Sequence, residues 1–218
     1  MTDERSVRSY DLLTDEHLRR LVTLAAADDL VFKREYPEWA TILLACCLVQ
    51  GGARHYVYGD RGIKDLDIYL FYELPRGRSA SHFPWNRGGS TRNRDFGDSA
   101  LGRQLYTAKD WTDSKLAPKV PNWDLYSGRR VDIISRAIAP HPEGAKSSVR
   151  QWLERGRDRR HAPGSSDWNL SRTPVVCLYP EMAEVWWTGL EVDEAGIEKG
   201  AYGAEAARLP TWVRGEKP

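Results

Sequence analysis

The strongest constraint on the fold is the segment "DLDIYLFYEL" at residues 65–74, an apolar run headed by two acids. Its isoleucine, tyrosine and phenylalanine residues predict a β-strand. Asp65 and Asp67 are two residues apart, so on a strand their side chains point to the same face. Two carboxylates on one face repel each other unless a positive charge lies between them. The pattern therefore indicates a cation at the start of this strand.

A hard divalent cation would satisfy this requirement. Mg²⁺ prefers one or two carboxylates together with waters and substrate phosphates, so D-x-D at the start of a strand indicates a metal and phosphate site. Alternating acids also occur on ordinary surface strands, and the pair alone does not decide between the two. Gly51 and Gly52 precede the pair by twelve intervening residues. Glycines allow a backbone to approach phosphate oxygens closely, although a plain turn would also use them.

A third acid lies in a later apolar run, "RRVDIIS" at residues 129–135. A bare charge in a strand of this kind is costly. Asp132 is therefore expected either to form an ion pair with Arg129 or Arg130, or to join the first two acids from an adjacent strand. Three carboxylates can hold two metal ions for an in-line phosphoryl displacement.

Together these features resemble the polymerase-β-like nucleotidyltransferase superfamily, whose pattern is two small residues, a gap, D-x-D and a later strand acid. The matching residues are Gly51, Gly52, Asp65, Asp67 and Asp132. The stretch at residues 50–67 is most similar to the toxin-type enzymes of abortive-infection and toxin–antitoxin systems. Those enzymes carry a histidine near the glycines and an arginine before D-x-D, for which His55 and Arg61 are the candidates. Lys64 stands where many relatives have serine, and the gap from Asp67 to Asp132 is long.

The resemblance implies a cytoplasmic, Mg²⁺-dependent enzyme that transfers a nucleoside monophosphate from an NTP, such as ATP, to an acceptor hydroxyl. It implies two Mg²⁺ ions, with Mn²⁺ as a substitute. One ion would hold the triphosphate through Asp65 and Asp67, and the other would be bridged by both and by Asp132. The implied nucleotide-binding residues are Gly51, Gly52, Arg61 and Lys64.

The acceptor is less constrained than the reaction. Residues 76–130 contain eleven Lys and Arg against five Asp and Glu, whereas residues 181–208 contain seven acids and two bases. The basic segment favours RNA, above all tRNA, over a protein side chain or a small molecule. An antitoxin protein is a further expected partner. The alternative is a non-catalytic module of the same fold that binds a nucleotide or RNA and regulates a partner.

The expected fold class is α/β (α+β), with a short mixed sheet, helices packed on it and a long irregular insertion. We expect one nucleotidyltransferase-like domain over residues 1–218, made of a helical segment (1–44), a catalytic core (45–138) with an insertion (76–123), and a helix and strand segment (139–218). Helices are expected over residues 14–29, from Pro37 onward, over 145–160 and over 180–190; further strands are expected over 128–138 and 173–181.

Cysteine usage and hydropathy favour the cytoplasm. Cys46, Cys47 and Cys177 are odd in number and have no C-x-x-C spacing, which fits a reducing compartment and argues against zinc. The first ten residues are polar and lack the core of a signal peptide. The longest apolar run, residues 42–49, is too short to span a membrane and is expected to be a buried strand or helix end.

Overall fold

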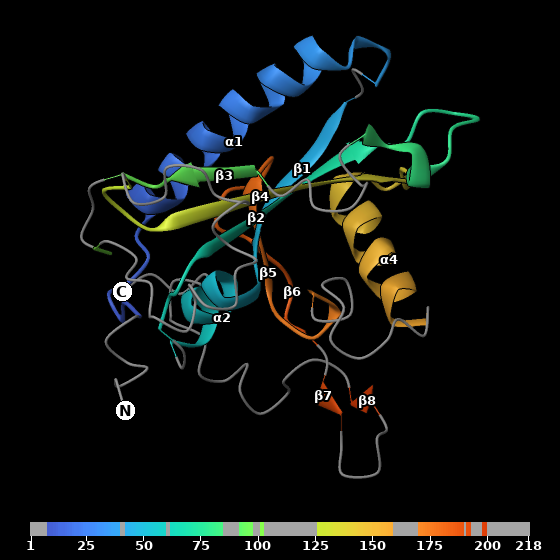
Figure 1. The fold of residues 1–218 in the computed structure, drawn as a ribbon. Coiled ribbons are helices and arrows are strands. Elements are labelled where there is room, and N and C mark those ends of the chain that lie inside the picture. Colours follow the sequence, from blue (N-terminus) through green and yellow to red (C-terminus); the bar gives the residue numbers. More distant parts are fainter. Residues whose placement is uncertain are drawn as a thin grey trace, which may run out of the picture.

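The computed structural model describes most of the chain between residues 8 and 199 (Figure 1). The described residues are 8–39, 42–59, 62–84, 92–97, 101–102, 126–158, 170–189, 191–192 and 198–199.

Within these residues the main sheet has six strands in the order β3-β4-β2-β1-β5-β6. The α-helices are α1 (Asp15–Glu35), α2 (Gln50–Tyr58) and α4 (Ala145–Asp158), with short 3-10 helices η2 (Pro37–Trp39) and η3 (Ala80–His82). The strands are β1 (Leu43–Val49), β2 (Leu66–Glu73), β3 (Arg92–Asp95), β4 (Arg130–Ile138), β5 (Val175–Tyr179) and β6 (Val185–Trp187); β7 (Glu191–Val192) and β8 (Glu198–Lys199) form a separate pair. The β2 and β4 strands are parallel and the other neighbours are antiparallel. The predicted mixed α/β fold is confirmed.

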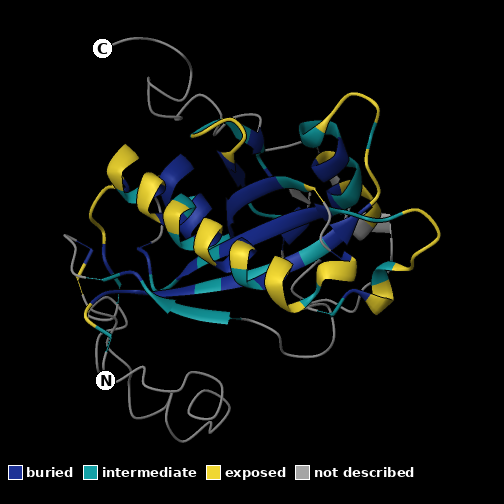
Figure 2. Ribbon diagram, turned by 90° about the horizontal axis from the view of Figure 1, so that it is seen from above, coloured by how far each residue is buried: buried dark blue, intermediate teal, exposed yellow. Residues whose placement is uncertain are grey.

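Helix α1 starts where its first turn is capped. The Thr14 hydroxyl accepts a hydrogen bond from the His17 backbone, and the His17 ring accepts one from the Thr14 backbone N–H. This reciprocal pair satisfies N–H groups that have no partner inside the helix. Asp15 and Glu16 in the first turn further stabilise the positive end of the helix dipole. Figure 2 shows α1 exposed along its outer side and lying across buried strands.

The sheet has a hydrophobic core on each face. On one face α1 and α2 pack against alternate strand residues; this core includes Leu21, Phe32, Val57, Leu48, Ile68, Tyr72 and Ile133. On the other face α4 covers the intervening residues; this core includes Val149, Leu153, Cys47, Tyr69, Phe71 and Cys177. Because side chains alternate along a strand, the residues at 65, 67, 130 and 132 belong to the face that carries Tyr69 and α4.

A buried ion cluster fixes edge strand β3 to α1. The Asp28 side chain is fully buried and accepts two hydrogen bonds from Arg92 Nε, at 2.8 and 2.7 Å, and one from Arg94, at 3.1 Å. Arg92 also donates to the Ser135 hydroxyl at 2.9 Å. Charge-assisted hydrogen bonds of this kind are stronger than hydrogen bonds between neutral groups. Arg92 and Arg94 therefore lie on the α1 face of the sheet, opposite to the face of the three acids.

The helix predicted from Pro37 onward is wrong. Among the described residues of this segment, 37–39 form a short 3-10 helix, and the apolar run from Leu43 forms strand β1. Strand β1 lies between β2 and β5, and the two hydrophobic cores bury both of its faces from Ala45 to Val49. A short continuous apolar run of this kind cannot be told from a buried helix by periodicity.

The helix predicted over residues 180–190 is also wrong. Ala183 adopts a positive φ of 71° in a turn, its N–H donates to Cys177 O, and Cys177 N–H donates to Glu184 O. The chain reverses there and pairs β6 with β5.

The predicted insertion at residues 76–123 contributes to the sheet. Its residues 92–95 form β3, which pairs with β4, and most of its remainder lies outside the described residues. None of the described helices is long and apolar enough to cross a lipid bilayer.

Candidate active site on the first residues of strands β2 and β4

The structure brings the three predicted acids to neighbouring positions. Asp67 and Asp132 are register partners on the parallel strands β2 and β4. Asp65 precedes β2 by one residue and is two residues from Asp67, so all three are on one face of the sheet. The expectation that Asp132 lies on a strand beside the first two acids is confirmed. Their catalytic role stays a prediction.

The guanidinium of Arg130 lies between two of these carboxylates. Its Nη2 donates to Asp65 Oδ2 at 2.6 Å, and its Nε is 2.9 Å from Asp132 Oδ1. The second contact is an ion pair whose alignment falls outside that of a hydrogen bond, which leaves Asp132 Oδ1 as a buried acceptor without one. The expected ion pair to a neighbouring arginine is therefore present together with the three-acid arrangement.

The three carboxyl groups lie close enough to affect one another's ionisation. Burial raises the pKa of Asp67 well above its usual range, and the Asp65 and Asp132 carboxylates raise it further, against the opposite effect of Arg130. Burial also raises the pKa of Asp132 to about 7, although the Arg130 charge lowers it. Raised carboxyl pKa values caused by burial and like charges are typical of functional sites.

The two glycines open helix α2 beside the acids. Strand β1 ends at Val49, which is the register partner of Asp67, and α2 begins at the next residue. Val49 provides no side-chain cap for the helix. The positive end of α2 therefore lies beside the first residues of β2, which is a favourable position for phosphate oxygens.

Gly51 and Gly52 have different surroundings. A Cβ on Gly52 would be 2.9 Å from Leu48 Cδ1 and 3.3 Å from Leu66 Cδ2, whereas a Cβ on Gly51 would meet nothing within 4 Å. Gly52 is thus required by packing between the helix and the sheet. Packing does not explain Gly51, so its backbone is open to the approach of a ligand.

We expect Gly52→Ala to destabilise the fold and Gly51→Ala to leave it unchanged or slightly more stable. The added methyl of Gly52→Ala must displace the buried Leu48, at a cost of about 1–3 kcal/mol. Gly51→Ala replaces a helical glycine without a clash, which contributes up to about 1 kcal/mol of stability. Urea denaturation of both variants would measure the difference, and equal free energies of unfolding would contradict the assigned packing.

The other predicted site residues differ in their placement. Lys64 lies directly before Asp65, and its backbone carbonyl accepts a hydrogen bond from buried Arg129 at 3.3 Å. His55 is buried, and its Nε2 is 3.0 Å from the Asp11 carbonyl, so it fixes the N-terminal segment to α2. Arg61 lies outside the described residues.

The donor types fit a hard divalent cation, but the carboxylates are not arranged as a preformed metal site. Three carboxylates, one with a buried oxygen that lacks a hydrogen bond, form the oxygen-rich set that Mg²⁺ prefers. In the part of the chain that the structure describes, no three His, Cys, Asp or Glu side chains are grouped to hold a metal ion. Arg130 lies between Asp65 and Asp132 and contacts one oxygen of each, so a cation that bridges these two oxygens would compete with it.

Two features of this site were not predicted as parts of it. The sequence predicts Arg130 only as an ion-pair partner of Asp132. Its spacing of two residues from Asp132 on a strand places it on the same face. Gln50 has a positive φ of 53° at the junction of β1 and α2. Such strained backbone is found at functional sites more often than elsewhere, but no residue type in the sequence indicated it.

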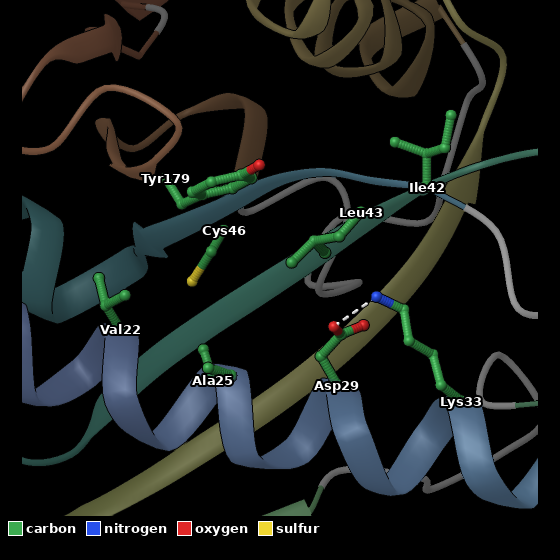
Figure 3. A pocket seen from close by; sticks show the side chains of 9 residues that line it. Val22, Ala25, Asp29, Lys33, Ile42, Leu43, Cys46 and Tyr179 are labelled. Carbon is green, nitrogen blue, oxygen red and sulfur yellow. Dashed lines mark hydrogen bonds and ion pairs between the residues drawn. The ribbon is translucent and has the colours of Figure 1, made fainter.

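A separate cavity of about 580 Å³ lies on the opposite face, between α1 and strands β1 and β5 (Figure 3). Val22, Cys46 and Tyr179 line it, and the ion pair of Lys33 with Asp29, at 2.8 Å, is at one side. Because Cys46 belongs to the α1 core, this cavity is not part of the acidic site.

No protein-family model matches the chain, and comparison with curated proteins and with solved structures gives no match. The functional argument therefore rests on the arrangement of the residues themselves.

Proposed function

We propose that this chain is a metal-dependent nucleotidyltransferase, which transfers a nucleoside monophosphate from an NTP to an acceptor hydroxyl and releases pyrophosphate. The observation that carries the proposal is the register pairing of Asp67 with Asp132, with Asp65 on the same face. Three half-buried carboxylates placed together repel one another. Arg130 neutralises part of this charge, and a cationic ligand would neutralise the rest.

Each group around the acids has a role in this reaction. The amino-terminal turn of α2, opened by Gly51, would accept the triphosphate oxygens, and Lys64 would contact them from the start of β2. Asp65, Asp67 and Asp132 would hold Mg²⁺, or Mn²⁺ in its place. The bound ions would neutralise the phosphates and lower the pKa of the acceptor hydroxyl. The protein's own contribution is positioning and charge complementarity.

RNA is the acceptor that the chain favours, because the eleven Lys and Arg of residues 76–130 outnumber five acids. A protein side chain and a small molecule are the other acceptor classes. Membership of a toxin–antitoxin pair, and with it an antitoxin partner, belongs to the same proposal and rests on the likeness of residues 50–67 to the toxin-type enzymes.

The pairing of Arg130 with Asp65 and Asp132 favours a second candidate, a non-catalytic module that binds a nucleotide or RNA. In such a module the guanidinium would neutralise the acids permanently. The two candidates differ in one result, the appearance of labelled product.

Incubation with each α-labelled NTP, Mg²⁺ and either total RNA or an RNase-treated lysate tests the proposal. We expect one NTP to label an RNA band, and we expect the label to be absent with Asp67→Asn. Nucleotide binding without a labelled product from any acceptor would favour the non-catalytic module. The absence of both binding and labelling would contradict both candidates.

RNA binding should weaken steeply with salt. A protein that neutralises about four phosphates loses roughly 10²-fold in affinity between about 50 and about 200 mM salt, because counterions are released on binding. Fluorescence anisotropy with labelled tRNA at several salt concentrations would measure the slope. An affinity that does not change with salt, or no binding at low salt, would exclude RNA as the acceptor and favour a protein or a small molecule.

A further inference from the structure

Arg130 is an almost buried cation within an acidic site. Its side chain is 9% exposed, and its guanidinium contacts the two carboxylates that flank it, Asp65 at 2.6 Å and Asp132 at 2.9 Å. Arg130 and Asp132 are two positions apart on β4, so their side chains lie on the same face of the sheet as Asp67. The guanidinium is therefore an internal counter-charge of Asp65 and Asp132.

Arg130 holds Asp65 Oδ2 and Asp132 Oδ1, one oxygen of each carboxylate. A divalent cation that bridges Asp65 and Asp132 through these oxygens competes with the guanidinium, because two cations at that separation repel each other. A metal bound in this way therefore displaces the guanidinium. Arginine has a long side chain that permits this movement, and its planar fork binds phosphate oxygens through two parallel hydrogen bonds.

We propose that Arg130 is a metal-displaced counter-ion: it neutralises Asp65 and Asp132 in the free protein, and on metal entry it pairs with the phosphate oxygens of the incoming NTP. The inference rests on the proposed function. It makes the binding of metal and NTP cooperative, because the metal displaces a cation that the NTP then binds. By linkage, each ligand raises the affinity of the other by the same factor.

Two other arginines show why this role belongs to Arg130. Arg129 donates to the backbone carbonyls of Leu101, at 3.0 Å, and Lys64, at 3.3 Å. Arg136 is on the same strand and face as Arg130, but its guanidinium lies over the Tyr69 ring at 5.3 Å. Arg136 also donates to the Ser135 carbonyl at 3.0 Å. It is thus a matched control, an arginine of the same strand and face that packs over an aromatic ring.

The test measures Mn²⁺ affinity by electron paramagnetic resonance, with the metal alone and with a non-hydrolysable NTP analogue present. For the wild type we expect weak binding of Mn²⁺ alone and an affinity at least about tenfold higher with the analogue, within the usual range of coupling. Arg130→Gln should bind Mn²⁺ alone about tenfold more tightly than the wild type, with a coupling factor close to one. Arg136→Gln should behave as the wild type does.

Arg130→Lys provides a second variant in case Arg130→Gln does not fold. A lysine keeps the competing charge but lacks the fork, so Mn²⁺ alone should bind as weakly as to the wild type while the coupling factor falls. Unchanged coupling in Arg130→Lys, or unchanged or weaker Mn²⁺ binding in Arg130→Gln, would overturn the role of Arg130. A wild type that binds neither Mn²⁺ nor the analogue would instead contradict the proposed function, so the two failures are distinguishable.

Discussion

Asp67→Asn is expected to lower nucleotidyl transfer by about 10³-fold or more without destabilising the metal-free protein. The carboxylate would support several kcal/mol of charge stabilisation in the transition state, and an amide cannot replace it. The same carboxylate is unfavourable for the fold, because burial and two neighbouring carboxylates oppose its ionisation. Initial rates and thermal denaturation, each at about pH 8, would test the two halves of this prediction.

The stability difference between the wild type and Asp67→Asn should depend on pH. A carboxyl whose pKa is higher in the folded state than its unfolded value of about 3.9 binds a proton more tightly when folded. The contribution of Asp67 and Asp132 to stability is therefore fully present below about pH 4 and is lost as the pH rises; for Asp132 the loss extends through about 7. Asp132 is present in both proteins, so the difference reports Asp67. We expect the wild type to lose stability relative to Asp67→Asn as the pH rises above about 4 in the absence of divalent metal.

Asp95→Asn is a matched control on the same sheet. The Asp95 carboxylate accepts hydrogen bonds from the backbone of Gly97, at 2.9 Å, Ser127, at 2.8 Å, and Gly128, at 2.9 Å. Its loss should lower stability and leave transfer per folded molecule largely intact. A fall in activity that followed stability in both variants would contradict a specific role for Asp67.

Asp132→Asn is expected to separate chemistry from binding. If Asp132 holds the metal that activates the acceptor, its loss removes an interaction made mainly in the transition state. Transfer should then fall by about 10²–10⁴-fold, while the affinity for Mg²⁺ and NTP changes only a few-fold, since Asp65 and Asp67 remain. Single-turnover rates and equilibrium binding of the NTP would measure the two effects separately.

The opposite result would identify Asp132 as a structural ion-pair partner of Arg130 only. In that case Asp132→Asn would lower the melting temperature and leave turnover per folded molecule unchanged. Asp132→Glu distinguishes the cases further, because it retains the charge that pairs with Arg130 but displaces the carboxylate from its position beside Asp67.

The parts of the fold that the sequence predicted correctly have an unambiguous local pattern. Strand β2 combines aromatic and β-branched residues, and α4 has the helical spacing expected for residues 145–160. The sequence left residues 42–49 open between a strand and a helix end, because the continuous apolar run of β1 shows no period. The helix predicted over residues 180–190 is wrong because strand β6 depends on a tertiary contact, its pairing with β5 after a turn at Ala183.

In the candidate site, too, the sequence predicted what a local pattern determines and did not predict what depends on strand pairing. The spacing of Asp65 and Asp67 determines a shared face as soon as β2 is a strand. The pairing of Asp67 with Asp132 required the strand order and register, which no local pattern specifies across a gap of this length. The position of Arg130 between Asp65 and Asp132 depends on that same register. The sequence alone therefore predicts only the face of the sheet on which Arg130 lies.

The most direct test of the central claim compares the same NTP labelled on the α-phosphate and on the γ-phosphate. Purified protein is incubated with Mg²⁺ and the acceptor fraction, and both the acceptor and the released phosphates are analysed. The proposed function predicts that the α-label enters the acceptor, that the γ-label leaves as pyrophosphate, and that Asp67→Asn gives neither product. Transfer of the γ-label to the acceptor, or labelling that persists in Asp67→Asn, would contradict it.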